Sequence, residues 1–175
     1  MSKTTLRKEL IKLNREHLAE LVMWMYTVSK ESKEYLEFYL DPDAEALYNT
    51  MCDKIAKEFK RVKYGRRSKA RPGIIKQIIK KFRSFQPGDD YVRRFYVYVI
   101  QEAITAEKCL YFTEAQYRSF STIAADGLKL ADKNGYFSSY LEEMNAVIQA
   151  VDGSDYFKKL LRTSLQETLL ENKLK

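Results

Sequence analysis

The residues whose types and spacing suggest chemistry in this sequence are lysines and arginines within one stretch. Residues 54–83 contain thirteen of them and a single acid, Glu58. The stretch therefore carries a charge of +12, whereas the whole 175-residue chain carries +7 and the remainder carries −5. Concentrated positive charge repels itself and attracts anions. The chemistry that this pattern favours is the binding of an anionic group, not a reaction.

Nine cations of this stretch are the candidate anion-binding residues. A helix predicted to begin at Pro72 offers unpaired backbone N–H groups at its start, where Lys69 and Arg71 precede it, and this arrangement favours phosphate. Tyr64 and Phe85 accompany the stretch but do not alternate with the cations as aromatic residues do in single-strand binders. The candidates are Lys57, Lys60, Arg61, Arg66, Arg67, Lys69, Arg71, Lys76 and Lys80.

Other residues that could take part in catalysis or metal binding have structural explanations. His17 is the only histidine, so no histidine-based metal cluster or nucleophile–base pair can be assigned. Paired carboxylates, such as Asp89 and Asp90, fall at predicted helix starts, where acids stabilise the helix dipole. A carboxylate magnesium site stays open but has no specific signal. Because phosphate-binding glycine loops are also absent, we expect no enzymatic activity, cofactor or metal.

Cysteine content and apolar run lengths indicate the compartment. Cys52 and Cys109 are isolated in the sequence and are expected to be small core residues in a reducing environment. The first ten residues are polar and basic, without the apolar run of a secretory signal. The longest apolar runs have six residues, whereas a membrane span needs about 20. We therefore expect a cytoplasmic protein that does not enter a membrane.

Helical periodicity of apolar residues extends along the chain and predicts an all-α fold. Six glycines and three prolines are too few for the many turns of an all-β protein. No residue pattern recurs at a fixed period, so a regular solenoid is not expected. The prediction is a single irregular multi-helix domain of about eight or nine helices over residues 1–175, built from helical hairpins, with a frayed tail at 171–175.

The basic stretch is predicted to form a helical hairpin over residues 43–83. Tyr48, Met51 and Ile55 begin one apolar stripe at helical spacing, and cations form a second stripe on the same segment. A polar cationic loop over 64–73 leads to a second helix with an apolar stripe of its own. We therefore expect two antiparallel helices that carry lysines on their outer faces.

Start and stop signals predict several helix boundaries. The sequence from Asp41 through Pro42 to Asp43 predicts a helix start with Asp41 as the cap. Capping boxes at 113–116 and 139–142 predict two more starts, the first with a hydrophobic staple. Asn134-Gly135 is typical of a helix end. The apolar run 95–100 is expected to lie at the centre of the fold.

Several segments together resemble a known family. They are Leu6 to Leu10, Leu18 to Leu21, Lys33 to Leu40 before Asp41-Pro42, Lys60-Arg61, Ile78 to Phe82, and Gln86-Pro87. This pattern over residues 4–150 resembles an uncharacterised family of small bacterial all-helical proteins, a domain of unknown function. The resemblance implies an all-helical fold. It implies no catalytic or binding residues, because its motifs are packing and capping positions.

The functional hypothesis that follows is a non-enzymatic binding module. The basic helical hairpin would dock an anionic partner, which is a nucleic acid or a ribonucleoprotein. The alternative is a helical scaffold that self-associates as a homo-oligomer or binds an acidic protein partner. The first hypothesis depends on whether the cations of the hairpin project outward as one surface.

Overall fold

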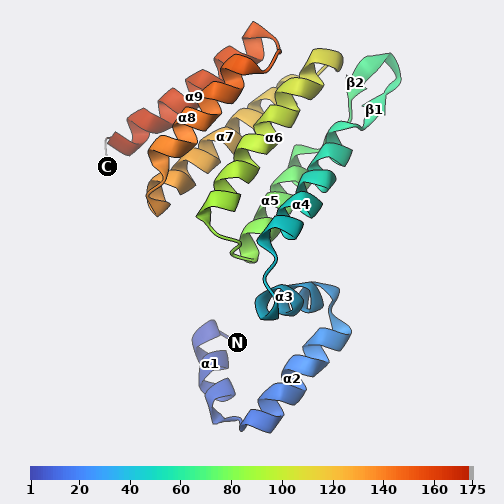
Figure 1. Cartoon of the computed structure of the whole chain (residues 1–175), viewed down its shortest axis with the longest axis vertical. Coiled ribbons are helices and arrows are strands. Elements are labelled where there is room, and N and C mark those ends of the chain that lie inside the picture. Colours follow the sequence, from blue (N-terminus) through green and yellow to red (C-terminus); the bar gives the residue numbers. More distant parts are fainter. Residues whose placement is uncertain (174–175) are drawn as a thin grey trace. The chain divides into compact units, whose positions relative to one another are not determined.

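The structure is a computed structural model that describes residues 1–173, and it is helical apart from one short β-hairpin (Figure 1). Residues 1–173 contain nine α-helices, so the predicted all-α fold with eight or nine helices is confirmed. The elements are α1 (Lys3–Lys12), α2 (Arg15–Val28), α3 (Lys30–Leu40), α4 (Ala44–Phe59), β1 (Val62–Lys63), the short 3-10 helix η1 (Tyr64–Arg66), β2 (Arg67–Ser68), α5 (Pro72–Ser84), α6 (Asp89–Cys109), α7 (Glu114–Asn134), α8 (Phe137–Ala150) and α9 (Asp155–Lys173).

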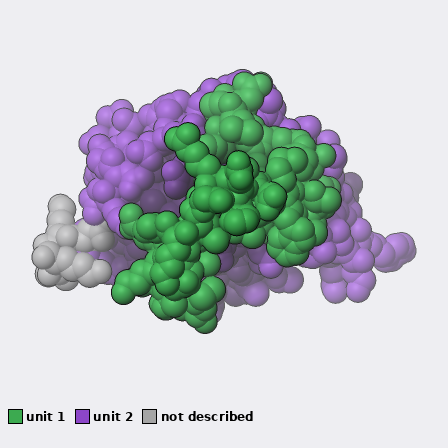
Figure 2. Space-filling view, turned by 90° about the horizontal axis from the view of Figure 1, so that it is seen from below, with its two compact units in different colours: residues 1–43 green, residues 44–175 purple. Residues whose placement is uncertain are grey.

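The chain divides into two compact units, residues 1–43 and residues 44–175, which Figure 2 shows in different colours. The sequence was expected to form one domain, and that stays a prediction. The described part of the predicted frayed tail is helical, because α9 extends to Lys173. Glu171 forms an ion pair with Lys129 at 3.1 Å. Residues 174 and 175 lie outside the described residues.

The larger unit contains α4 to α9, which lie side by side in Figure 1. Helix α6 contacts α4, α5, α7 and α8, and α7 contacts α5, α6, α8 and α9, so these two helices form the centre. Phe95, Val99 and Ile100 of α6 are fully buried, which confirms the predicted central position of 95–100. The rings of Phe82 and Phe95 lie 4.5 Å apart between α5 and α6.

The smaller unit contains α1, α2 and α3, and none of these helices has a buried residue. Asn14 caps α2, and its side chain accepts a hydrogen bond from the His17 N–H at 2.8 Å. Helices α2 and α3 contact each other, and the Tyr26 hydroxyl donates to Glu37 at 2.9 Å. Large apolar side chains of this unit are exposed, and Trp24, for example, is 63% exposed. This unit is therefore held by local contacts without a buried core.

Two predicted helix starts are wrong. Asp41 caps the end of α3 instead of starting α4, and its N–H donates to Glu37 O at 3.0 Å. Pro42 disfavours helical geometry at the residue before it, so α3 ends and α4 begins only at Ala44. The second capping box, at 139–142, is also absent because α8 begins earlier, at Phe137.

The start and end of α7 agree with the sequence prediction. Thr113 and Gln116 form the capping box, and the rings of Phe112 and Tyr117 lie 5.7 Å apart, as a hydrophobic staple requires. Gly135 ends the helix in the left-handed conformation with φ of 82°. The chain then re-enters a helix within two residues, which places Ser139 inside the first turn of α8.

The connection between α4 and α5 is more ordered than the predicted loop. β1 and β2 pair in antiparallel register, with Val62 opposite Ser68 and Lys63 opposite Arg67. The chain reverses at Gly65 and Arg66, whose φ values of 74° and 58° both lie in the left-handed region. Glycine adopts that region without strain, and successive left-handed residues suit a tight reversal. The basic hairpin therefore consists of two helices capped by a small β-ribbon.

Candidate anion-binding surface

Helix α5 presents three of its four cations along one side. Its buried residues, Ile75, Ile79 and Phe82, form the apolar stripe that anchors the helix. Lys76 and Lys80 each follow one of these residues, and Arg83 continues the same row one turn later. Residues three and four apart share a helix face. The three cations therefore lie in a row beside the buried stripe.

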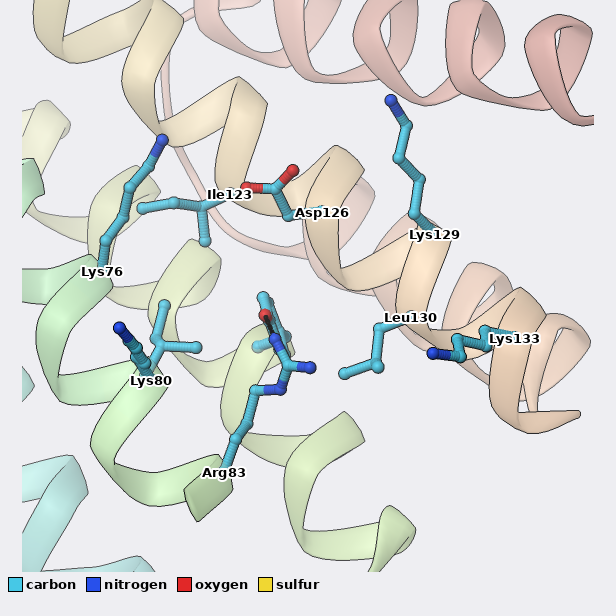
Figure 3. Close-up of a pocket in the computed structure, with 10 residues that line it drawn as sticks. Lys76, Lys80, Arg83, Ile123, Asp126, Lys129, Leu130 and Lys133 are labelled. Carbon is cyan, nitrogen blue, oxygen red and sulfur yellow. Dashed lines mark hydrogen bonds between the residues drawn. The ribbon is translucent and has the colours of Figure 1, made fainter. Parts of the chain in front are cut away.

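A cleft of about 450 Å³ separates this row from α7, and we call it the basic cleft. Figure 3 shows Lys76, Lys80 and Arg83 on α5 and Asp126, Lys129 and Lys133 on α7. Its lining contains five cations and one acid, together with Tyr96 from α6 and apolar residues. The full lining is Lys76, Ile79, Lys80, Arg83, Tyr96, Ile123, Asp126, Lys129, Leu130 and Lys133.

Four cations of the basic cleft make no ion pair within the described part of the chain: Lys76, Lys80, Arg83 and Lys133. The fifth, Lys129, is paired with Glu171 at 3.1 Å. In Figure 3 the Lys129 ammonium points away from the α5 side chains. The positive charge of the cleft is therefore only partly compensated.

Tyr96 places a hydroxyl group in the basic cleft. The side chain is 4% exposed, and its hydroxyl accepts a long hydrogen bond of 3.5 Å from Arg83 Nη1. Burial raises the pKa of Tyr96, and the positive charge of Arg83 offsets that effect only in part. The phenol is therefore neutral near pH 7, and its O–H can donate a hydrogen bond to an anion held by the lysines.

The nine candidate anion-binding residues lie in different parts of the structure. Lys76 and Lys80 line the basic cleft. Lys57, Lys60 and Lys69 are exposed on α4 and on the segments that follow it. Arg66 and Arg67 lie on the β-ribbon. The candidates do not all converge on one pocket.

Two candidates are engaged by the one acid of the stretch. Arg71 donates from Nη2 to Glu58 Oε1 at 2.6 Å and from Nε to Glu58 Oε2 at 3.0 Å. Arg61 Nη1 lies 3.8 Å from the same carboxylate. Hydrogen bonds from Arg71 lower the pKa of Glu58, although burial acts in the opposite direction. Arg61 and Arg71 therefore hold the base of the β-ribbon, where α4 ends and α5 begins, and are less available to a ligand.

Sequence reasoning missed the α7 side of the cleft. Lys129 and Lys133 are four residues apart, and that spacing placed them on one helix face. Nothing in the sequence indicated that this face lies opposite Lys76 and Lys80, because contact between α5 and α7 is a tertiary feature.

Other site types find no support in the residues that the structure describes. Within 1–173, no three histidine, cysteine or acidic side chains converge as metal ligands. None of the described helices combines the length and the apolar character that a transmembrane span requires. His17 lies exposed in the first turn of α2.

Comparison with known proteins gives one match. The model of a family described as "Family of unknown function (DUF6155)" matches residues 1–155, which include α1 to α8. No curated protein and no solved structure matches the chain. The resemblance noted in the sequence is confirmed, because the match covers most of the chain. This chain therefore belongs to the Family of unknown function (DUF6155).

Proposed function

We propose that this protein is a non-enzymatic binding module that docks a nucleic acid, free or within a ribonucleoprotein, on its basic hairpin and the adjoining cleft. The observation that supports this most directly is the basic cleft. Two helices that are distant in sequence place Lys76, Lys80, Arg83 and Lys133 around one hollow without acid partners in the described chain. Uncompensated charge of this kind costs self-repulsion, which an anion relieves.

The spread of the cations supports a polymer over a small anion. The row of cations on helix α5 runs from Lys76 to Arg83, and at about 1.5 Å per residue it covers a length of about 10 Å. Lys69 precedes this helix, and Arg66 and Arg67 extend the positive surface onto the β-ribbon. A single phosphate reaches only part of this surface. A nucleic-acid backbone offers phosphates at regular intervals along the whole of it.

The test is a titration with single-stranded RNA and with duplex DNA at about 50 mM and about 200 mM salt. If the four unpaired cations of the cleft each meet a phosphate, the affinity for duplex falls about a hundredfold over that range. The absence of binding at the lower salt concentration overturns the proposal.

A triple variant and a matched control locate the binding. Lys76→Gln/Lys80→Gln/Lys133→Gln removes three cleft charges and is expected to weaken binding to every sequence by a similar factor. Lys3→Gln/Lys8→Gln/Lys30→Gln changes the net charge equally in the smaller unit. Equal losses for the two variants show that only net charge matters, which contradicts a docking site at the cleft.

A second function, as a self-associating helical scaffold, is favoured by the surface of the smaller unit. The α2 segment from Leu21 to Met25 is apolar throughout, and no residue of that helix is buried. Trp24 is the only tryptophan of the chain, so its fluorescence reports on this helix alone. A scaffold predicts a blue shift of this emission, with dimers in light scattering, as protein concentration rises. A monomer with solvent-exposed tryptophan emission at all concentrations excludes it.

The proposed compartment is the cytoplasm. Both cysteines are free in the structure, as expected in a reducing environment.

A further inference from the structure

The tip of the basic hairpin carries a second hollow, distinct from the basic cleft. It has a volume of about 590 Å³ and is lined by Lys63, Tyr64, Gly65, Arg67 and Tyr111. Four of these residues belong to the β-ribbon and its turn, whereas Tyr111 comes from the connection between α6 and α7. The fold thus brings an aromatic residue distant in sequence beside the aromatic residue of the hairpin.

Backbone hydrogen bonds fix Tyr111 against the ribbon. The Tyr111 N–H donates to Arg66 O at 2.8 Å, and the Ser68 N–H donates to Tyr111 O at 3.0 Å. Tyr111 also forms an isolated parallel bridge with Arg67. These contacts extend the ribbon by one position, so the ribbon and Tyr111 present their side chains from a defined backbone.

A buried side chain ties the ribbon to α7. Gln116, which is 8% exposed, donates from Nε2 to Ala70 O at 2.9 Å. Its Oε1 accepts from the Thr113 N–H at 2.8 Å and so completes the capping box. The residue that completes the capping box of α7 therefore also holds the strand-to-helix connection of the basic hairpin.

Both tyrosine rings at the tip are open to solvent. The Tyr64 side chain is 98% exposed and that of Tyr111 is 70% exposed. Neither hydroxyl has a hydrogen bond within the described part of the chain, so no such bond has to break when a ligand contacts either ring. Single exposed aromatic residues are common. Two that line the same hollow beside Lys63 and Arg67 form a more specific arrangement.

We propose that this tip is a stacking platform for unpaired nucleobases, so that the nucleic acid bound by the protein is single-stranded. The proposal rests on the proposed function and names its ligand class. Aromatic faces stack on bases of any sequence, and nearby cations contact the connecting phosphates. Lys63, Arg66 and Arg67 supply those cations at the tip.

The exposure of the rings favours single strands over duplexes. In a duplex the face of each base is covered by its neighbours, so surface tyrosines reach only the terminal pair. In a single strand the bases can splay apart and stack on protein rings. The basic cleft then tracks the backbone, while the tip engages bases.

The experiment uses the full chain and three probes: a fluorescent oligouridylate of about 12 nucleotides, a duplex of the same length, and inorganic polyphosphate, each at low salt. Tyr64→Ala and Tyr111→Ala are each expected to weaken oligouridylate binding about 5- to 100-fold. Polyphosphate binding is expected to change little, because it has no bases. Tyr64→Phe keeps the ring and is expected to retain wild-type affinity.

Tyr39→Ala is the matched control. That tyrosine is 71% exposed in the smaller unit, so its loss removes a similar ring without touching the tip. Circular dichroism of each variant verifies the fold. If no probe binds the wild type, the proposed function and this inference both fail. If all three bind but the tip variants behave like Tyr39→Ala, or the duplex binds as tightly as the single strand, only the stacking platform is refuted.

Discussion

Replacing Gly127 by alanine tests the packing of α7 against Tyr140 and against Tyr96, which lines the basic cleft. Gly127 is buried in the middle of α7. An alanine Cβ at this position would overlap Tyr140 Oη and would lie 2.7 Å from Tyr140 Cζ and 2.9 Å from Tyr96 Cδ1. Tyr140 is fully buried, and its hydroxyl donates to Ala124 O at 2.8 Å. The ring therefore cannot move aside without strain or the loss of that hydrogen bond.

Three effects determine how much Gly127→Ala changes the free energy of unfolding. Alanine is favoured over glycine in a helix by about 1 kcal/mol. Overpacking a core costs about 1–3 kcal/mol, and leaving a buried hydroxyl unpaired costs about 1–3 kcal/mol. The steric effects exceed the helix preference, so we expect Gly127→Ala to lower the free energy of unfolding by roughly 1–5 kcal/mol.

Urea denaturation of four proteins measures this effect: the wild type, Gly127→Ala, Tyr140→Phe and the double variant. Because phenylalanine lacks the overlapping oxygen, Tyr140→Phe is expected to cost less in the alanine background than in the wild type. If Gly127→Ala instead stabilises the protein by about 1 kcal/mol, helix preference alone decides the outcome. The close approach of α7 to Tyr140 and Tyr96 would then be refuted.

Three further outcomes follow from single side chains. Gln116→Leu removes the donor to Ala70 O and is expected to lower the free energy of unfolding by about 1–3 kcal/mol. Amide hydrogen exchange in residues 62–68 should become faster, and unchanged exchange there would contradict the role of Gln116 in holding the ribbon. The pKa of Glu58 is lowered in the folded state by Arg71, so this carboxylate stabilises the protein above its unfolded-state pKa and loses that effect as pH falls through its folded-state pKa. The wild type should therefore be more stable than Glu58→Gln near pH 7, with a gap in unfolding free energy that closes in acid; a gap independent of pH counts against the pair. Burial raises the pKa of Cys52 to about 11, whereas Cys109 is exposed. A thiol reagent near pH 8 should therefore modify only Cys109 in the native protein and both cysteines after unfolding. Modification of both cysteines in the native protein would refute the burial of Cys52.

Local signals in the sequence were sufficient for much of the fold. The apolar run around Phe95 extended too far for a strand, and α6 is accordingly helical and central. The capping box at Thr113 and the glycine at 135 marked both ends of α7, because each satisfies backbone groups within its own turn. Signals of this kind need no knowledge of distant segments.

The predictions of helix boundaries were wrong where two local sequence signals competed. Asp41 precedes a proline, a context compatible with starting one helix or ending another, and the end of α3 prevailed. Ser139 and Glu142 have the spacing of a capping box, but α8 had already begun at Phe137. The β-ribbon was missed because its strands have two residues each. No alternating pattern can be recognised over so short a length.

The candidate site was predictable in part. The concentration of charge identified Lys76 and Lys80 because it is a property of composition. Lys133, Tyr96 and Tyr111 were missed because only tertiary contacts bring them to the hairpin. The pairing of Arg71 with Glu58 spans 13 positions and likewise depends on how α4 and α5 pack.

Differential acetylation of lysines, with and without bound single-stranded RNA, tests the docking surface most directly. We expect the RNA to protect Lys76, Lys80 and Lys133, which line the basic cleft. Lys3, Lys8 and Lys30 are exposed in the smaller unit and should react equally in both states. If RNA binds while the three cleft lysines stay as reactive as in the free protein, the basic cleft is not the docking site.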